Sequence, residues 1–135
     1  MPTNILIDLN VILDIFLERN GFVASSDVIQ LGETQDHTLY ISAHIVSTFA
    51  YLLENAKVPR QKILEHIDWM LQTFTVVPVD SQLLVLALKS NVVDFEDAII
   101  EQAAQVSDCS LIITRNIKDF KASVVKAIPP EQLLQ

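Results

Sequence analysis

The stretch Asn4-Ile5-Leu6-Ile7-Asp8 decides the fold, because it is a short apolar run that ends abruptly in a carboxylate. Such a run predicts a buried strand with a charged group at its carboxyl end. Asn10 is predicted to cap the helix that follows, and Gly21 is predicted to stop it after Leu17. The chain therefore begins with a strand that leads directly into a helix.

The same alternation continues along the rest of the chain. Short apolar runs predict further strands, and apolar spacings of three and four residues predict helices between them. The strands are expected at 39–41, 74–77, 111–114 and 124–128, and the helices at 23–33, 45–53 after a cap at Ser42, 59–71, 81–88 and 94–106. Strands that alternate with helices indicate a three-layered α/β fold in which a mainly parallel sheet is covered on both faces.

Composition limits the class of protein. The chain has 135 residues, half of them hydrophobic, which indicates a single domain over 1–135 with a substantial core. The net charge of −8 argues against nucleic-acid binding through a broad basic face, but it allows a carboxylate-rich site that recruits cations. The longest apolar run, 83–88, is too short to span a membrane. A lone cysteine and no visible signal peptide predict a cytoplasmic protein.

Polar residues gather where the predicted strands end. Ligands of open parallel sheets bind outside the carboxyl ends of the strands. The residues expected at that edge are Asp8, Asp94, Asp97, Asn116 and Asp119. Carboxylate and carbonyl oxygens are the ligands that Mg²⁺ prefers, so the sequence predicts a metal site there.

Each acidic residue also has a purely structural interpretation. Asp94 suits a helix cap, and Asp97 gains from the helix dipole whether or not it binds a metal. Asp119 is placed to cap a turn. Asp8 is different, because a carboxylate at the end of a buried strand requires a partner. The three histidines, His37, His44 and His66, lack zinc-ligand spacing and are expected to be ordinary helix or loop residues.

Three motifs carry a family resemblance. The segment 8–14 resembles the opening D-x-N-v-i-l-D of PIN domains, the ribonuclease fold of VapC-like toxins in bacterial toxin–antitoxin pairs. The segment 94–98, Asp-Phe-Glu-Asp-Ala, resembles the central D-f-x-D-A of that family. The segment 114–120, Thr-Arg-Asn-Ile-Lys-Asp-Phe, resembles its late T-R-[DN]-x-x-D-F. The order and spacing of the three match the family over nearly the whole chain.

The resemblance implies an α/β/α sandwich and a Mg²⁺- or Mn²⁺-dependent ribonuclease with an antitoxin partner and a homodimeric assembly. It implies catalytic roles for Asp8, Asp97 and Asp119, metal binding by these three with Asp94 and Asn116, and RNA contacts from Asn10, Thr114, Arg115 and Lys118. The apolar helices at 23–33 and 45–53 leave room for the dimer interface.

Two positions depart from the family pattern. The helix after the second strand carries Ser47-Thr48 where the family often has a glutamate, and Asn116 stands where many members have an aspartate. A site with fewer carboxylates holds a second cation less firmly. Two alternatives therefore stay open: a PIN-like binding module that has lost catalysis, and a phosphoaspartate enzyme or receiver domain, which also places an aspartate at the end of its first strand.

Overall fold

The computed structural model describes residues 3–34 and 37–135, and its strands form one parallel sheet. The strand order across the sheet is β3-β2-β1-β4-β5, so β1 lies at the centre. The strands are β1 (Thr3–Ile7), β2 (His37–Ser42), β3 (Thr75–Val77), β4 (Leu111–Ile113) and β5 (Lys126–Ile128).

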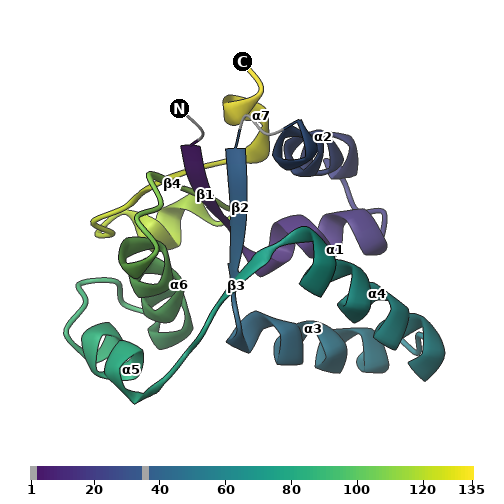
Figure 1. Cartoon of the computed structure of the whole chain (residues 1–135), viewed down its shortest axis with the longest axis horizontal. Helices are drawn as coiled ribbons and strands as arrows, with labels where there is room; N and C mark the ends of the chain where they lie inside the picture. Colours follow the sequence, from purple (N-terminus) through teal and green to yellow (C-terminus); the bar gives the residue numbers. More distant parts are fainter. Residues whose placement is uncertain (1–2, 35–36) are drawn as a thin grey trace.

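Helices cover both faces of this sheet, which confirms the predicted α/β/α sandwich (Figure 1). One layer contains α1 (Leu9–Phe16), α2 (Phe22–Glu33), α3 (His44–Asn55) and α4 (Arg60–Thr73), and the opposite layer contains α5 (Ser81–Leu88) and α6 (Phe95–Val106). A 3₁₀ turn, η1 (Ile117–Phe120), follows β4, and the short α7 (Pro130–Leu133) packs against α2.

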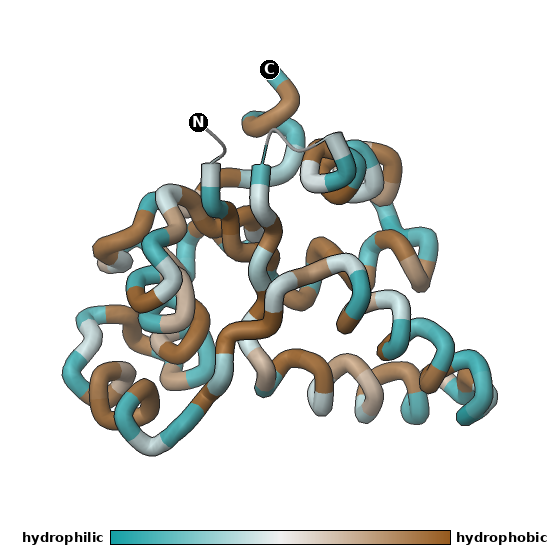
Figure 2. Tube along the Cα trace, in the orientation of Figure 1, coloured by the Kyte–Doolittle hydropathy of each residue, from teal (hydrophilic) through white to brown (hydrophobic). Residues whose placement is uncertain are grey.

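The core explains why β1 is central. Ile5, Leu6 and Ile7 are all completely buried, as expected for a strand that is covered on both faces. Figure 2 shows hydrophobic residues along the strands and on the helix sides that face them. No helix within 3–34 and 37–135 is both long and apolar enough to cross a bilayer.

The register of the sheet brings two segments that lie far apart in sequence to one edge. Ile7 pairs with Ile113, and the backbone N–H of Asp8 donates to the carbonyl of Ile113 at 2.9 Å. The residues that follow β1 and β4, Asp8 and Thr114, therefore lie side by side.

Several predicted boundaries are wrong by a few residues. Asp8, not Asn10, caps α1, because its carboxylate accepts from the backbone N–H of Leu9 at 2.8 Å. Asn10 lies inside α1, and Gly21 is the left-handed residue (φ 88°) that precedes α2. Ser42 ends β2 and does not cap α3, whose first turn follows Ala43.

The last strand is shorter than the predicted 124–128. The backbone N–H of Val124 donates to the carboxylate of Glu101, and that of Val125 donates to the Ser123 hydroxyl. Because side chains satisfy both amides, regular pairing with β4 begins only at Lys126.

Candidate functional site

A hollow of about 100 Å³ opens at the carboxyl edge of the sheet. Its polar lining comes from the end of β1, the start of α1, the first turns of α3, the start of α6 and the segment after β4: Asp8, Asn10, His44, Thr48, Glu96, Asp97 and Asn116. Of these seven, Asp8, Asp97 and Asn116 were predicted to meet at this edge, and Asn10 was predicted to contact RNA.

Asp8 is the buried acid of the hollow, with 6% of its surface exposed. Thr114 Oγ1 donates to Asp8 Oδ2 at 2.7 Å, while Leu9 N donates to Oδ1 at 2.8 Å. Burial raises the pKa of Asp8 and the charge of Asp119 adds to the rise, although the two hydrogen bonds oppose it. The carboxylate is thus held in one orientation at the floor of the hollow.

Asp97 lines the same hollow as Asp8 from the first turn of α6. Burial has the largest effect on its pKa, followed by the charges of Asp8, Asp94, Asp119 and Glu96, and together they raise it to about 7. Asp94 caps the same helix, since its Oδ1 accepts from the backbone N–H of Asp97 at 3.0 Å. The structural interpretation of Asp94 as a helix cap is therefore confirmed, its charge also acts on Asp97, and its metal binding stays a prediction.

Asp119 and Asp94 lie on a neighbouring hollow of about 230 Å³, which they share with Lys118 and Lys121. Asp119 does not line the first hollow, but its charge raises the pKa of both Asp8 and Asp97. The sequence prediction therefore grouped acids that belong to two adjoining hollows coupled by their charges.

Two residues predicted to contact RNA have other partners. Thr114 is completely buried, and its hydroxyl both donates to Asp8 and accepts from Asn116 N at 3.0 Å. Neither Thr114 nor Arg115 lines the hollow. The geometry gives Thr114 the role of orienting Asp8 and the backbone of Asn116.

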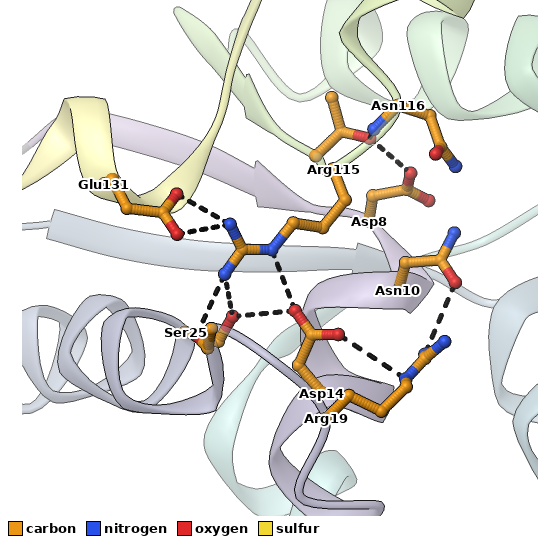
Figure 3. A network of polar contacts seen from close by, with 10 residues as sticks. Asp8, Asn10, Asp14, Arg19, Ser25, Arg115, Asn116 and Glu131 are labelled. Carbon is orange, nitrogen blue, oxygen red and sulfur yellow. Dashed lines mark hydrogen bonds and ion pairs between the residues drawn. The ribbon is translucent and has the colours of Figure 1, made fainter.

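Arg115 is engaged in the polar network of Figure 3. Its Nε donates to the buried carboxylate of Asp14 at 2.8 Å, and its Nη1 pairs with Glu131 of α7. Its Nη2 donates to the carbonyl of Gly21 at 2.9 Å and to Ser25 Oγ at 3.2 Å. The guanidinium points away from Asp8 and Asn116 and joins α1, α2 and α7.

Sequence reasoning missed three residues that line the hollow: His44, Thr48 and Glu96. His44 was set aside because it lacks a zinc-ligand partner, yet it begins the helix immediately after β2. The rule that ligands bind beyond strand ends applies to β2 as much as to β1, and would have found His44. Of the predicted hydroxyl pair, Thr48 lines the hollow and Ser47 is exposed.

The donor set fits a hard divalent cation held partly by water. Within residues 3–34 and 37–135, no three carboxylate, imidazole or thiol groups form a ready ligand cluster. Mg²⁺ needs only one or two carboxylates when it keeps several waters, and Asp8 and Asp97 supply two next to the amide of Asn116. The pKa of Asp97 is raised first by burial and then by the like charges around it, and a bound cation would relieve that repulsion.

Similar folds occur in solved toxin–antitoxin structures. VapBC2 from Rickettsia felis bound to a promoter DNA fragment matches with a TM-score of 0.74 at 12% identity, covering 94% of this chain and 98% of that one. VapBC-1 from nontypeable Haemophilus influenzae gives 0.73 at 15% identity, with 96% and 99% covered. A toxin–antitoxin complex from Klebsiella pneumoniae gives 0.64 at 24% identity, with 93% and 96% covered. At these identities the likeness concerns the fold.

The comparison with curated proteins finds no match. A family model described as PIN domain matches residues 4–118, a range that includes Asp8, Asp94, Asp97 and Asn116 and ends one residue before Asp119. Since that range covers most of the chain, this protein belongs to the PIN domain family.

Proposed function

We propose that the protein is a divalent-metal-dependent ribonuclease and the toxin of a toxin–antitoxin pair. The observation that carries the proposal is the hollow that Asp8, Asp97 and Asn116 line together, with the pKa of Asp97 raised to about 7. Membership of the PIN domain family and the fold shared with toxin–antitoxin complexes support it.

Asp8 and Asp97 would hold the cation, and the carbonyl oxygen of Asn116 would complete its ligands. A bound Mg²⁺ or Mn²⁺ polarises the scissile phosphate and lowers the pKa of water, which provides the nucleophile for phosphodiester hydrolysis. Asp94 and Asp119 add negative potential from the neighbouring hollow, and this potential favours the retention of a cation at Asp8 and Asp97.

The chain's other residues position these groups and the RNA. Thr114 keeps Asp8 in one rotamer through its 2.7 Å hydrogen bond. Lys118 and Lys121 are exposed beside Asp119 and would attract phosphates of the RNA backbone, and Asn10 would contact RNA at the edge of the first hollow. Arg115 would act from within its network, by holding the segment that carries Asn116.

A second candidate function is a PIN-like binding module without catalysis. It is favoured by the absence of a ready three-ligand cluster among the described residues and by Thr48, which lines the hollow from the helix where the family often has a glutamate. A binding module and a nuclease differ in one measurable respect, the formation of metal-dependent RNA product.

The test is cleavage of labelled single-stranded RNA by purified protein with Mg²⁺, Mn²⁺ or EDTA. We expect slow product formation in Mg²⁺, faster formation in Mn²⁺ and none in EDTA. Asp97→Ala should lose at least about 100-fold in rate, because it removes one of two charged ligands. Asn116→Asp should raise the rate in Mg²⁺, because it adds a carboxylate beside the cation.

Asp27→Ala is the matched control, since Asp27 is an exposed acid on α2 outside both hollows. It should cleave like the wild type. If neither the wild type nor Asn116→Asp forms metal-dependent product, the binding module would be favoured. Product that survives Asp97→Ala would show a contaminating ribonuclease and overturn the assigned roles.

A further inference from the structure

We propose that His44 is an additional substrate-binding residue, whose Nε2–H donates a hydrogen bond to a nonbridging phosphate oxygen of the RNA in the hollow. This inference rests on the proposed function and names a group that binds the substrate of the same site. Three observations carry it: the position of His44, the orientation of its ring, and its free N–H beside three carboxylates that line the same hollow.

The position of His44 follows from the sheet. β2 lies directly beside β1, so the residues after Ser42 open on the same edge as Asp8. His44 is the first residue of α3, and it lines the hollow with Asp8, Asp97 and Asn116. A phosphate held by a cation between Asp8 and Asp97 would thus lie within the same small space as the imidazole.

The buried Ser42 side chain orients the imidazole ring of His44. Ser42 Oγ lies 3.0 Å from His44 Nδ1, and the Ser42 side chain is completely buried. This is the one hydrogen bond of the Ser42 hydroxyl within the described residues, and a buried O–H needs an acceptor. We infer that Ser42 donates to Nδ1, which places the proton of the neutral ring on Nε2.

Nε2 is the free side of this ring. Nε2 makes no hydrogen bond with the residues that the structure describes. It is also not one of the fully buried side-chain atoms that lack a partner in that part of the chain. Burial lowers the pKa of His44, although Glu96 opposes the shift, so the ring is neutral at neutral pH. His44 thus offers an uncharged N–H that can approach a phosphate without displacing a cation from the neighbouring carboxylates.

The side chains that can donate in this hollow are His44, Thr48 and the amides of Asn10 and Asn116. Asp8, Glu96 and Asp97 provide acceptors, and the Thr48 hydroxyl donates back to the His44 carbonyl at 3.4 Å. Cation binding uses the acceptors, whereas the remaining phosphate oxygens need donors. The free Nε2–H of His44 adds a donor to those of the two amides.

The experiment measures the affinity of a short fluorescein-labelled single-stranded RNA in Mg²⁺ on ice, before product forms, and the Mg²⁺-induced rise in Tm. His44→Phe keeps a ring but removes the donor, and we expect about tenfold weaker RNA binding with an unchanged Mg²⁺-induced rise. His44→Gln keeps an amide donor and should restore part of the loss. Ser42→Ala should weaken binding by less than His44→Phe, because it frees the ring without removing it.

His66→Phe is the matched control. His66 is a half-buried imidazole on α4 that packs against Phe16, and its pKa is also lowered, first by burial, but it lies outside the hollow. It should bind RNA like the wild type.

Equal RNA affinity in the wild type and His44→Phe would overturn the inference. Loss of the Mg²⁺-induced rise in Tm in His44→Phe would also overturn it, because His44 would then act on the cation. If the wild type binds RNA, His44→Phe weakens that binding and no RNA is ever cleaved, the result would support this contact and refute the ribonuclease. Wild-type protein that binds no RNA in Mg²⁺ would refute both.

Discussion

Asp97 shows how its neighbours determine the chemistry of a single residue. It lies in the first turn of α6, where the helix dipole favours an ionised carboxylate. Its pKa is nevertheless raised to about 7, by burial and by the charges of Asp8, Asp94, Asp119 and Glu96. Without a cation, an ionised Asp97 destabilises the folded protein, and a cation that relieves the repulsion stabilises it.

The sign of this effect sets a prediction for Asp97→Asn. The pKa of Asp97 is higher in the folded protein (about 7) than the ordinary value of 3.8 for an aspartate, so ionisation costs stability as the pH rises from about 4 to 7. In EDTA at about pH 8, Asp97→Asn should be more stable than the wild type by about 1 kcal/mol, allowing for solvent screening, or roughly 3 °C in Tm.

Thermal unfolding across pH measures this difference. The advantage of Asp97→Asn should shrink toward about pH 5, where Asp97 of the folded wild type is protonated. Millimolar Mg²⁺ should raise the Tm of the wild type more than that of the variant. A wild type indifferent to Mg²⁺ would contradict a cation site at Asp97.

Helix α6 is joined to two other segments by a buried carboxylate. Glu101 is almost completely buried, and its Oε1 accepts from Ser90 Oγ at 2.5 Å and from Gln102 Nε2 at 2.8 Å. Its Oε2 accepts from the backbone N–H of Val124 at 2.9 Å. Glu101 thus ties α6 to the loop before it and to the segment before β5. No cation contacts this carboxylate among the described residues, so hydrogen bonds alone compensate its burial.

Glu101→Gln should destabilise the fold by about 2 kcal/mol, or roughly 6 °C in Tm. The reason is that the amide NH2 would replace one carboxylate oxygen, so a group that donates to Glu101 would face a second donor and lose its hydrogen bond. Burial raises the pKa of Glu101, but the hydrogen bonds from Ser90, Gln102 and Val124 outweigh it and lower the pKa below 4.5. The stabilisation is therefore present above about pH 4.5 and is lost as the pH falls through the lower folded pKa.

Chemical denaturation at neutral and acidic pH tests this prediction. The exposed Glu54 of α3 provides the control, and Glu54→Gln should change stability by less than about 0.5 kcal/mol. A Glu101→Gln protein as stable as the wild type at neutral pH would show that the carboxylate does not anchor α6.

On the scale of the whole molecule, exposed apolar side chains lie on more helices than the sequence indicated. In α2 and α3, Val28, Ile29 and Phe49 are in the core, whereas Val23 and Tyr51 are exposed, so an interface there stays a prediction. Helix α5 instead exposes four large apolar side chains, Leu84, Val85, Leu86 and Leu88, and is hydrophobic almost throughout in Figure 2. Exposed apolar side chains in this number favour a protein interface, and we propose that α5 contributes to a homodimer.

Val85→Glu is the corresponding test, since Val85 is about half exposed at the centre of α5. A charge there would be desolvated in a dimer, so we expect the mass in sedimentation velocity to fall from twice 15.1 kDa to 15.1 kDa without loss of Tm. Val124→Glu places the same change on an exposed valine before β5 and should leave the mass unchanged. A wild type that sediments as a monomer would exclude the homodimer.

The parts of this structure that could be predicted are those governed by local pattern. The run at 4–8 predicted a buried strand, and the helices at 81–88 and 94–106 were placed within a residue of α5 and α6. Errors occurred where side chains compete for backbone groups. Asp8 caps α1 where Asn10 was expected to do so. The last strand is two residues shorter than predicted, because Glu101 and Ser123 accept the backbone N–H groups of Val124 and Val125.

The sequence by itself determined the alternation of strands and helices, the parallel sheet and the convergence of Asp8, Asp97 and Asn116, because strand ends and helix starts are local features and parallel strands end at one edge. Only the tertiary structure decided the partners of Arg115, the division of the acids between two hollows and the place of His44 beside Asp8. The physical reason is that side-chain partners depend on distances between segments up to about a hundred residues apart, which strand register sets and local pattern does not contain.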